Sequence, residues 1–542
     1  MFHRPSALKP LRHADFRRFW AASQMSNFGG LVQGVAAAWT MTSLTSSPGL
    51  IALVQASGTL PILIFALAAG ALADSFDRRR VMLAALILMG VTSVCLVLAA
   101  RTGVLNEWSL LAFTFVIGIG GAFYNPSWQA SVGELVPRDE VPEAVSLNSM
   151  GFNLMRSIGP AAGGAIVAAF GAAAAFLVNA ISYFPIIAAI LWWKPATPAQ
   201  TLPREPFAMA VPAGLRYVLL SPNLMRVMLR SCLFGLGAVS VMALLPIVAR
   251  DRMNGDAVTY GLMLGALGLG ALGGGFANAA IRIRLGGEGV IRLGFACFAL
   301  ALVVLAVSSS LWTGLPAVAL AGAAWVMTLS LFNVTVQLSS PRWVLGRTLA
   351  FYQMAAFGGM AAGSALWGLV AGAIGIPGAL LLAALWLVAG AFVGLRLPLP
   401  SFADIDLSPL DRFRAPELQL DLRPRSGPIL VMIDYHIDPA DIRVFLAAMT
   451  ERRRIRRRDG ARQWVLLRDL EHPDMWTESY HVATWEDYLR HNMRRTVADA
   501  AVSDTLLRLH RGSSPPLVHR MIERQSAGSH ADIAMRHADP PH

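Results

Sequence analysis

One arginine lies in the middle of a long apolar stretch, where an ionised side chain has little water around it. Arg156 is followed within four residues by Gly159 and Pro160. A guanidinium near the centre of a bilayer costs at least ~2.5 kcal/mol on insertion scales, so it must face a cavity or a partner. Arg156 could therefore bind an anionic group of a substrate, replace a moving proton, or form a structural pair with helix-end carbonyls or polar side chains.

Uncharged polar side chains recur inside the other apolar stretches. Such side chains either form hydrogen bonds between neighbouring helices or line a polar path through a helix bundle. The residues predicted to line a substrate path are Arg156, Asn27, Gln55, Asn125, Gln129, Asn153, Asn333, Gln337 and Tyr352. No aspartate, glutamate or histidine lies deep inside an apolar stretch, although a proton carrier normally needs a titratable group. The remaining titratable candidates are peripheral: Asp15, Glu134, Asp251 and Asp256.

A short charged loop follows the second apolar stretch. It reads Gly70-Ala-Leu-Ala-Asp74-Ser-Phe-Asp77-Arg78-Arg79-Arg80. Gly70 permits close approach of two helices. Asp74 can form charge-assisted hydrogen bonds with the arginines, or meet the positive N-terminus of a neighbouring helix. We interpret Gly70, Asp74, Arg78 and Arg79 as a latch that forms in one conformation and breaks in another. The alternative is that the arginines only anchor the loop on one side of the membrane.

A proline flanked by glycines interrupts the fifth apolar stretch, in the sequence Gly159-Pro160-Ala-Ala-Gly163-Gly164. Pro160 removes a helix hydrogen bond and kinks the helix, and the glycines let another helix pack closely against it. A thin, kinked helix is suited to rocking and to sealing one side of a bundle. The alternative is a packing kink that carries no functional direction.

These residues lie in a chain whose composition excludes a soluble enzyme with a single core. Of 542 residues, 55% are hydrophobic and 14% charged, whereas soluble domains carry about 25% charged residues. Runs of about 20 apolar residues can each cross a bilayer. The sequence therefore predicts an all-α polytopic membrane protein with twelve spans in two six-helix halves. The predicted spans are 19–44, 49–73, 81–100, 108–130, 141–169, 172–193, 225–249, 258–282, 289–309, 312–337, 348–371 and 373–395.

Positive charges alternate between successive loops. Arginines cluster around 78–80 and 282–292, whereas the loops on the other side offer little beyond Arg101, Arg250 and Arg252. Basic loops stay in the cytoplasm, so both termini are expected there. No cleavable signal peptide is expected, because the first apolar run is too long for one. The net charge of +12 lies in the hydrophobic part of the chain, which argues against a nucleic-acid partner.

Composition shifts divide the chain into segments, and the two hydrophobic halves resemble each other. With a shift of 204 residues, the Gly70-x3-Asp74-x3-Arg78 pattern lies over Gly274-x3-Asn278-x3-Arg282. Such repeats place a substrate site between the halves, near the midplane. The predicted segments are a first half (1–193), a cytoplasmic linker (194–224), a second half (225–396), a proline-rich linker (397–427), a soluble domain (428–524) and a disordered tail (525–542).

The loop at 70–80 resembles the signature loop of the major facilitator superfamily, G-x-x-x-D-R-x-G-R-R, although Ser75 and Asp77 depart from it. The Asp77-Arg78-Arg79-Arg80 variant and the opening residues 11–20 resemble the transmembrane secretion effector branch, which includes enterobactin exporters and macrolide efflux proteins. Gly159–Gly164 resembles the antiporter motif of the superfamily. The resemblance covers about residues 8–396. It implies alternating access, proton coupling and export of siderophore-like or drug-like molecules, and an importer on the same scaffold is the alternative.

The soluble domain has a mixed pattern. Residues alternate with period two at 429–435, 463–468, 475–482 and 517–522, and follow helical spacing at 442–449 and 485–509. This β-α-β-β-α-β order predicts a ferredoxin-like unit. It resembles the dimeric α/β barrels that include antibiotic-biosynthesis monooxygenases.

We favour a regulatory or homodimerising module rather than an enzyme for this domain. The alternative is a membrane-tethered enzyme that modifies the cargo with Trp464, Trp476, His481 or His491. The arginine run 452–458 is either a solvated face or a contact with anionic lipid. The three cysteines lie in apolar runs without metal-ligand spacing, so we predict no metal and no cofactor. The expected partners are the lipid bilayer, a small-molecule substrate and protons.

Overall fold

The computed structural model describes residues 9–75, 77–137, 140–193, 207–341, 343–399, 406–407, 410 and 412–523. Most of them are helical. The chain forms two compact units. The first, here the helix bundle, comprises residues 1–205, 226–336 and 349–400. The second, here the carboxyl-terminal unit, comprises residues 206–225, 337–348 and 401–542.

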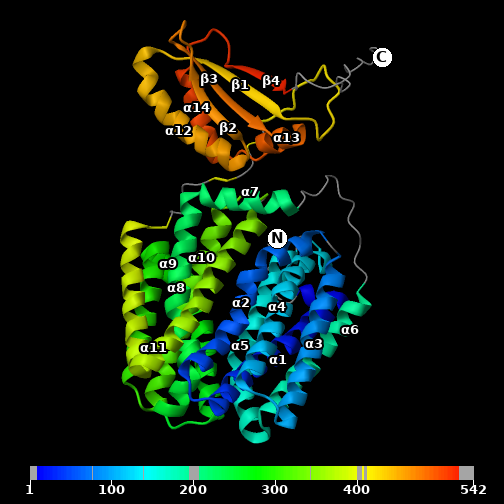
Figure 1. Ribbon diagram of the computed structural model, residues 1–542, viewed down its shortest axis with the longest axis vertical. Coiled ribbons are helices and arrows are strands. Elements are labelled where there is room, and N and C mark those ends of the chain that lie inside the picture. Colours follow the sequence, from blue (N-terminus) through cyan, green and yellow to red (C-terminus); the bar gives the residue numbers. More distant parts are fainter. Residues whose placement is uncertain are drawn as a thin grey trace, which may run out of the picture. The chain divides into compact units, whose positions relative to one another are not determined.

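Two groups of long helices lie side by side in the bundle (Figure 1). The amino-terminal group follows a short 3-10 helix, Lys9–Arg12. Its helices are α1 (Ala14–Leu44), α2 (Pro48–Ser75), α3 (Arg78–Thr102), α4 (Glu107–Leu135), α5 (Val141–Phe170) and α6 (Ala172–Trp192). Side-chain caps begin two of them: Asp77 accepts from the Arg79 amide, and Asn106 and Ser109 cap α4 reciprocally.

The second group contains two helices that are interrupted by one non-helical glycine each. Its helices are α8 (Pro222–Ile247), α9 (Ala257–Val307), α10 (Leu311–Leu338) and α11 (Leu345–Arg396), and a π-helical turn (Val248–Arg252) follows α8. Gly286 (φ 69°) interrupts α9 and Gly375 (φ 80°) interrupts α11. A left-handed φ favours glycine because it has no Cβ. Gly286 lies between the predicted spans 258–282 and 289–309, and Gly375 lies near the start of the predicted span 373–395, so each long helix is kinked close to the boundary between two predicted spans.

In the described part of the chain, eight helices are long and apolar enough to cross a membrane. The longest of them, α9 and α11, have 51 and 52 residues. Large apolar side chains point outward from the bundle, including Phe276 and Trp312, each 81% exposed. A soluble protein rarely exposes so much apolar surface, so this surface suits contact with lipid.

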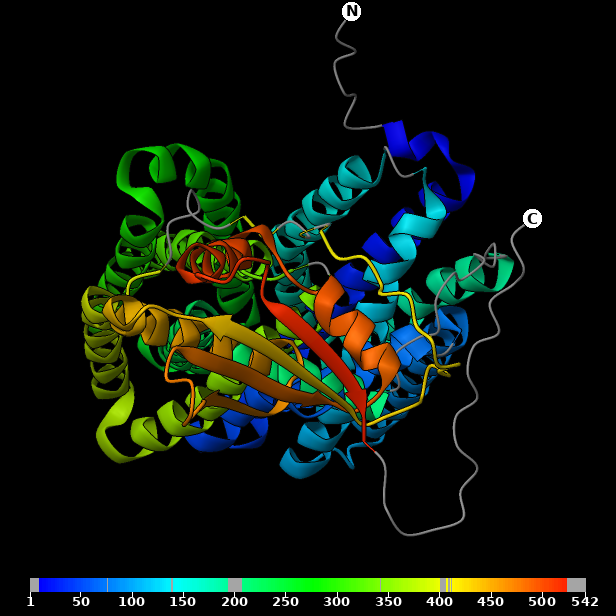
Figure 2. The same ribbon diagram turned by 90° about the horizontal axis from the view of Figure 1, so that it is seen from above.

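The carboxyl-terminal unit contains a four-stranded antiparallel sheet (Figure 2). Its elements are β1 (Ile429–His436), α12 (Ile442–Asp459), β2 (Arg462–Arg468), β3 (Met475–Val482), α13 (Trp485–Met493), α14 (Val497–Leu509) and β4 (Leu517–Ile522). The strand order is β2-β3-β1-β4, and every neighbouring pair is antiparallel. The single helix predicted over 485–509 is two helices, because the chain leaves the helix at Arg494 and Thr496 starts a new one with a capping box.

The same unit includes helix α7 (Phe207–Leu219), which lies inside the predicted linker, and the loop between α10 and α11. Buried Tyr217 of α7 has the Arg458 guanidinium 5.1 Å from its ring centre and the Trp343 ring 5.6 Å away, edge to face. Arg494 lies 4.0 Å above Trp343. Arg454 donates to the Leu220 carbonyl at 2.7 Å. These contacts attach α12 and α13 to segments that lead directly into α8 and α11.

Candidate functional site

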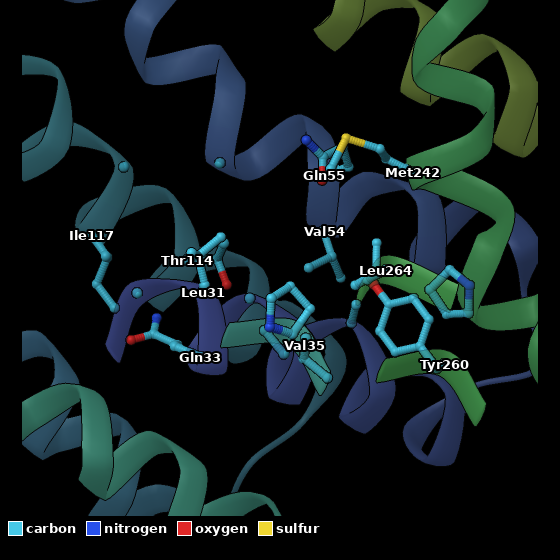
Figure 3. A pocket seen from close by; sticks show the side chains of 18 of the residues that line it. Leu31, Gln33, Val35, Val54, Gln55, Thr114, Ile117, Met242, Tyr260 and Leu264 are labelled. Carbon is cyan, nitrogen blue, oxygen red and sulfur yellow. The ribbon is translucent and has the colours of Figure 1, made fainter. Parts of the chain in front are cut away.

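A cavity of about 350 Å³ lies between the two helix groups of the bundle (Figure 3). Helices α1, α2, α4 and α5 of the first group and α8 and α9 of the second supply its walls. The lining is mostly apolar, with few polar side chains, which is the usual character of a small-molecule site. The polar side chains that line it are Gln33, Gln55, Thr114, Arg156 and Tyr260.

Arg156 is the charged residue of the cavity wall. Its helix is positioned by close packing: a Cβ added to Gly268 of α9 would lie 2.7 Å from the Arg156 carbonyl oxygen. The guanidinium lies 6.0 Å from the ring centre of Trp325 in α10, at the outer limit of a cation–π contact. Within the described residues it forms no hydrogen bond or ion pair. The described part of the cavity wall therefore contains a cation without a paired anion.

Gln33 is held in place by a buried polar cluster of the first helix group. Its amide oxygen accepts from Asn179 Nδ2 and, at 3.4 Å, from Ser93 Oγ. Asn179 also donates to the Tyr183 hydroxyl at 3.2 Å. By contrast, the Gln55 amide forms no hydrogen bond with another described residue, which leaves it available to a ligand. Sequence reasoning placed Gln55 on the path but omitted Thr114 and Tyr260, which lack a distinguishing local pattern.

The glycines of the antiporter-like motif face two different helices. Gly163 packs on α1, where an added Cβ would lie 3.1 Å from the Val32 Cα. Gly164 faces α9, where an added Cβ would lie 2.9 Å from the Gly261 Cα. Gly159 contacts Leu31, and Pro160 lines the cavity. The contact of Gly164 with α9 therefore joins the two helix groups next to the cavity.

Further contacts between the helix groups lie near the end of the bundle where Gly164 meets Gly261. A Cβ added to Gly368 of α11 would lie 3.0 Å from the Gly49 Cα of α2. Arg250, after α8, donates to the Thr42 carbonyl of α1, and Trp39 stacks on Tyr260. We call this end, with the Gly164–Gly261 contact, the closed end. The absence of side chains at these glycines brings the backbones together.

At the other end of the bundle, charged groups bond within the first helix group. Arg78 pairs with Glu134 at the end of α4, at 2.5 Å, and Arg79 donates to the Leu191 carbonyl at 2.7 Å. A Cβ added to Gly70 would meet open space. The side chain of Asp74 lies outside the described residues. Sequence reasoning named Glu134 only as a peripheral titratable group, because the pairing joins residues 56 positions apart.

The second helix group has its own carboxylate cluster, centred on Glu288. Glu288 pairs with the fully buried Arg230 at 2.6 Å and with Arg292 at 3.1 Å. It also accepts from the Leu399 amide at 3.2 Å. Asn278, which the internal repeat aligned with Asp74, is not part of this cluster. The cluster gives the second group a carboxylate at a position that the repeat did not indicate.

Six of the other residues predicted on the path lie outside the cavity wall. Asn27 and Asn333 are half-buried, and Asn125, Gln129 and Gln337 are exposed. Tyr352 is buried and its hydroxyl donates to the Leu329 carbonyl at 3.1 Å. The side chain of Asn153 lies outside the described residues. Of the nine predicted residues, the structure brings Arg156 and Gln55 together at the cavity.

The carboxyl-terminal unit holds a buried ionic cluster on the helix-facing side of its sheet. Fully buried Glu478 accepts from Arg456 at 3.0 Å, Arg452 at 3.4 Å and the Trp464 indole at 3.0 Å. Burial would raise the pKa of Glu478, but Arg456 and Arg452 lower it to about 2. Arg456 also contacts His491 at 2.9 Å. Burial and the neighbouring Arg456 lower the pKa of His491 well below its ordinary value, which keeps this imidazole neutral at pH 7.

The candidate enzyme residues of the domain differ in where they lie relative to this cluster. Trp464 and His491 belong to it, directly or through Arg456. His481 pairs with Leu430 of the neighbouring strand β1. It directly follows buried Tyr480 in β3, and successive side chains of a strand point to opposite faces, so His481 lies on the opposite face of the sheet. The arginine run is also divided, since Arg452, Arg456 and Arg458 are buried whereas Arg453 and Arg457 are exposed. The structure does not bring the four candidates together in one pocket.

Comparisons with known proteins agree with this architecture. The family profile described as transmembrane secretion effector matches residues 5–527. The chain is 28% identical to YfiS of Bacillus subtilis strain 168, an uncharacterized MFS-type transporter, over 35% of this chain and 45% of that protein. It is 25% identical to the staphyloferrin A transporter of Staphylococcus aureus, over 47% of this chain and 64% of that protein. The chain thus spans less than two thirds of either relative.

Longer matches come from an efflux pump and from solved structures. The multidrug efflux pump Tap of Mycolicibacterium fortuitum is 24% identical over 70% of this chain and 94% of its own length. The inward-facing, unoccupied structure of a bacterial homologue of the human lysosomal transporter Spinster matches with a TM-score of 0.56. That match has 16% identity and covers 72% of this chain and 98% of the other, so it concerns the fold alone.

Proposed function

This chain belongs to the transmembrane secretion effector family, and from that membership we propose that it exports small organic molecules through the cavity between its two helix groups. The observation that carries the proposal is the cavity itself, which takes its walls from both groups and lies beside the closed end. A site between two halves can open to either side of the membrane when the halves rock about it. The names of two relatives, a staphyloferrin A transporter and a multidrug efflux pump, support a small organic cargo.

We propose twelve membrane spans in the bundle. Helices α9 and α11 are each about twice the length that crosses a bilayer, and Gly286 and Gly375 mark where each divides. Dividing each of these two helices at its glycine raises the number of candidate spans from eight to ten. Helices α1 and α5, with 31 and 30 residues, supply the last two, because each is long enough to cross although polar residues lower its hydropathy. This count supports the twelve spans of the major facilitator fold.

The orientation that we propose follows from the arginines. Arg78 and Arg79 lie at the end of the bundle opposite the closed end, and basic loops face the cytoplasm. The structure would then be the state that is closed toward the outside, in a bacterial inner membrane with both termini in the cytoplasm. The ion pairs of Glu134 and Glu288 would form the latch of this state within each half, and we propose that Gly70 and Asp74 take part when the cytoplasmic end closes.

Proton coupling stays a prediction. The described cavity wall contains no aspartate, glutamate or histidine, so we propose that any coupled proton travels with the cargo or through water near Arg156. Proton coupling is tested by measuring export from proteoliposomes with and without an imposed pH gradient. Equal rates under both conditions would contradict coupling.

For the carboxyl-terminal domain we propose a ferredoxin-like fold with a regulatory or dimerising role. The strand order β2-β3-β1-β4 and the helix positions support that fold. The contacts of Tyr217 and Trp343 support a regulatory role, because they attach the domain to segments continuous with α8 and α11. The division of the candidate enzyme residues between two faces of the sheet favours this role over a monooxygenase-like enzyme.

Export is tested by expressing the full chain in a drug-sensitive bacterial host that lacks its own major efflux pumps. We expect cells with the protein to hold several-fold less of at least one compound from a panel of labelled macrolides and siderophores. A variant with Gly164→Leu, which cannot form the closed end, is the matched control and should accumulate as much as empty cells. Equal accumulation with wild type and control across the panel would contradict export, and higher accumulation with wild type would indicate uptake.

A further inference from the structure

The cavity has one formal positive charge that the described side chains do not neutralise. Arg156 lines it, whereas no aspartate or glutamate does so among the described residues. The contact that the guanidinium does make, with the face of Trp325 at 6.0 Å, holds a cation without cancelling its charge. The site is therefore incomplete without an anion, because a half-buried charge that has lost part of its hydration is stabilised by a paired counter-charge.

The chemistry of the guanidinium limits which anion fits. A planar guanidinium donates two parallel hydrogen bonds, which match the two oxygens of a carboxylate. A phosphate dianion would need more than one cation, and Arg156 is the one cation among the described residues of the wall. Gln55 and Tyr260 add neutral groups only. A monoanionic carboxylate is the best match to this set.

The remaining wall defines the rest of the ligand. Val35, Ile51, Val54, Met242 and Leu264 are apolar and come from four different helices. Figure 3 shows Val54, Leu264 and Met242 around the same space as Gln55 and Tyr260. A volume of about 350 Å³ suits a small ligand, at the lower end of known sites. An apolar body beside a single carboxylate would therefore fill the cavity.

We propose that the cavity binds amphipathic organic anions, with the carboxylate of the ligand paired to Arg156 and its apolar body against α1, α2, α8 and α9. This proposal rests on the proposed export function and names its substrate class. Neutral and cationic compounds of the same shape bind more weakly, because they leave the half-buried guanidinium unpaired.

The test uses a matched pair of fluorescent probes, dansyl-phenylalanine and its uncharged amide, with the purified full chain in nanodiscs. Dansyl fluorescence rises in an apolar site, so it reports binding directly. We expect the carboxylate to bind at least about tenfold more tightly than the amide. In Arg156→Gln the two affinities should fall within about twofold of each other, whereas Arg156→Lys should keep part of the preference as a point charge.

Arg101→Gln, which removes an exposed arginine at the end of α3, is the matched control and should keep the full preference. An unchanged preference in Arg156→Gln would overturn the proposal. Equal affinities, or no binding of either probe, in the wild type would overturn it as well. If the cell assay shows export while the carboxylate preference is absent, the export function stands and the anion site fails. If the carboxylate preference is present without export, the anion site stands and the export function fails.

Discussion

Replacing Gly261 with alanine is expected to reduce export about tenfold. A Cβ at this position would lie 2.8 Å from the Pro160 carbonyl oxygen and 2.9 Å from the Gly164 Cα. Both neighbours are backbone atoms, which cannot rotate away, so α5 and α9 must separate. Overpacking of this kind costs about 1–3 kcal/mol, which lowers the equilibrium constant for forming the closed state by roughly 5- to 150-fold. The measurement is the initial rate of export of a transported compound from proteoliposomes.

The same helix offers a control for the glycine substitution. Gly273 also lies in α9, and a Cβ added there would meet no atom within 4 Å. Gly273→Ala removes the same conformational freedom from the same helix and should export at close to the wild-type rate. Equal losses in the two variants would show that α9 requires glycine for a reason other than the closed end.

Replacing Glu478 with glutamine should destabilise the carboxyl-terminal domain by about 3–5 kcal/mol. The substitution leaves Arg452 and Arg456 buried without their carboxylate, and an uncompensated buried charge has a large free-energy cost. The measurement is hydrogen exchange of the β1 and β3 amides in the full chain in detergent. Opening should become several hundredfold more frequent in Glu478→Gln.

The pH dependence of this contribution follows from the depressed pKa of Glu478. Its pKa of about 2 in the folded protein lies below its ordinary value of 4.5. The stabilisation is therefore fully present above the ordinary value and is lost as the pH falls through about 2. The difference between wild type and Glu478→Gln should stay constant from about pH 5 to about pH 8. Glu471→Gln, on the exposed β2–β3 loop, should behave as wild type. A small effect in Glu478→Gln would contradict the assigned role of the cluster.

Apolar run length could predict the helices, because a bilayer imposes a minimum apolar length on any spanning segment. Ala14–Leu44 and Arg78–Thr102, for example, contain the predicted spans 19–44 and 81–100 with two to five extra residues at one or both ends. The general surroundings of Arg156 could also be predicted, since an ionised group in an apolar stretch requires a cavity or a partner. The sequence showed the requirement, and the structure shows that a cavity meets it.

Pairings between distant residues could not be predicted, since they depend on how the helices and strands pack. Arg456 belongs to a run that resembles a solvated face, and its partner Glu478 lies on a strand 22 residues later. Glu288 meets Arg230 from 58 residues away. Gly261 is one of many glycines in the chain. It differs from Gly273 only because it lies where α9 crosses α5. Tertiary packing supplies this information and local spacing does not.

Cross-linking α5 to α9 tests alternating access most directly. An ideal Cβ at Gly265 lies 3.4 Å from the Ala161 Cβ, close to the spacing of about 3.5–4.5 Å that a disulfide requires. The variant carries Ala161→Cys and Gly265→Cys, with Cys95, Cys232 and Cys297 replaced by serine. Oxidation should stop export in proteoliposomes and reduction should restore it, because the locked protein cannot leave the closed state. Export at the same rate before and after complete cross-linking would contradict the alternating-access account.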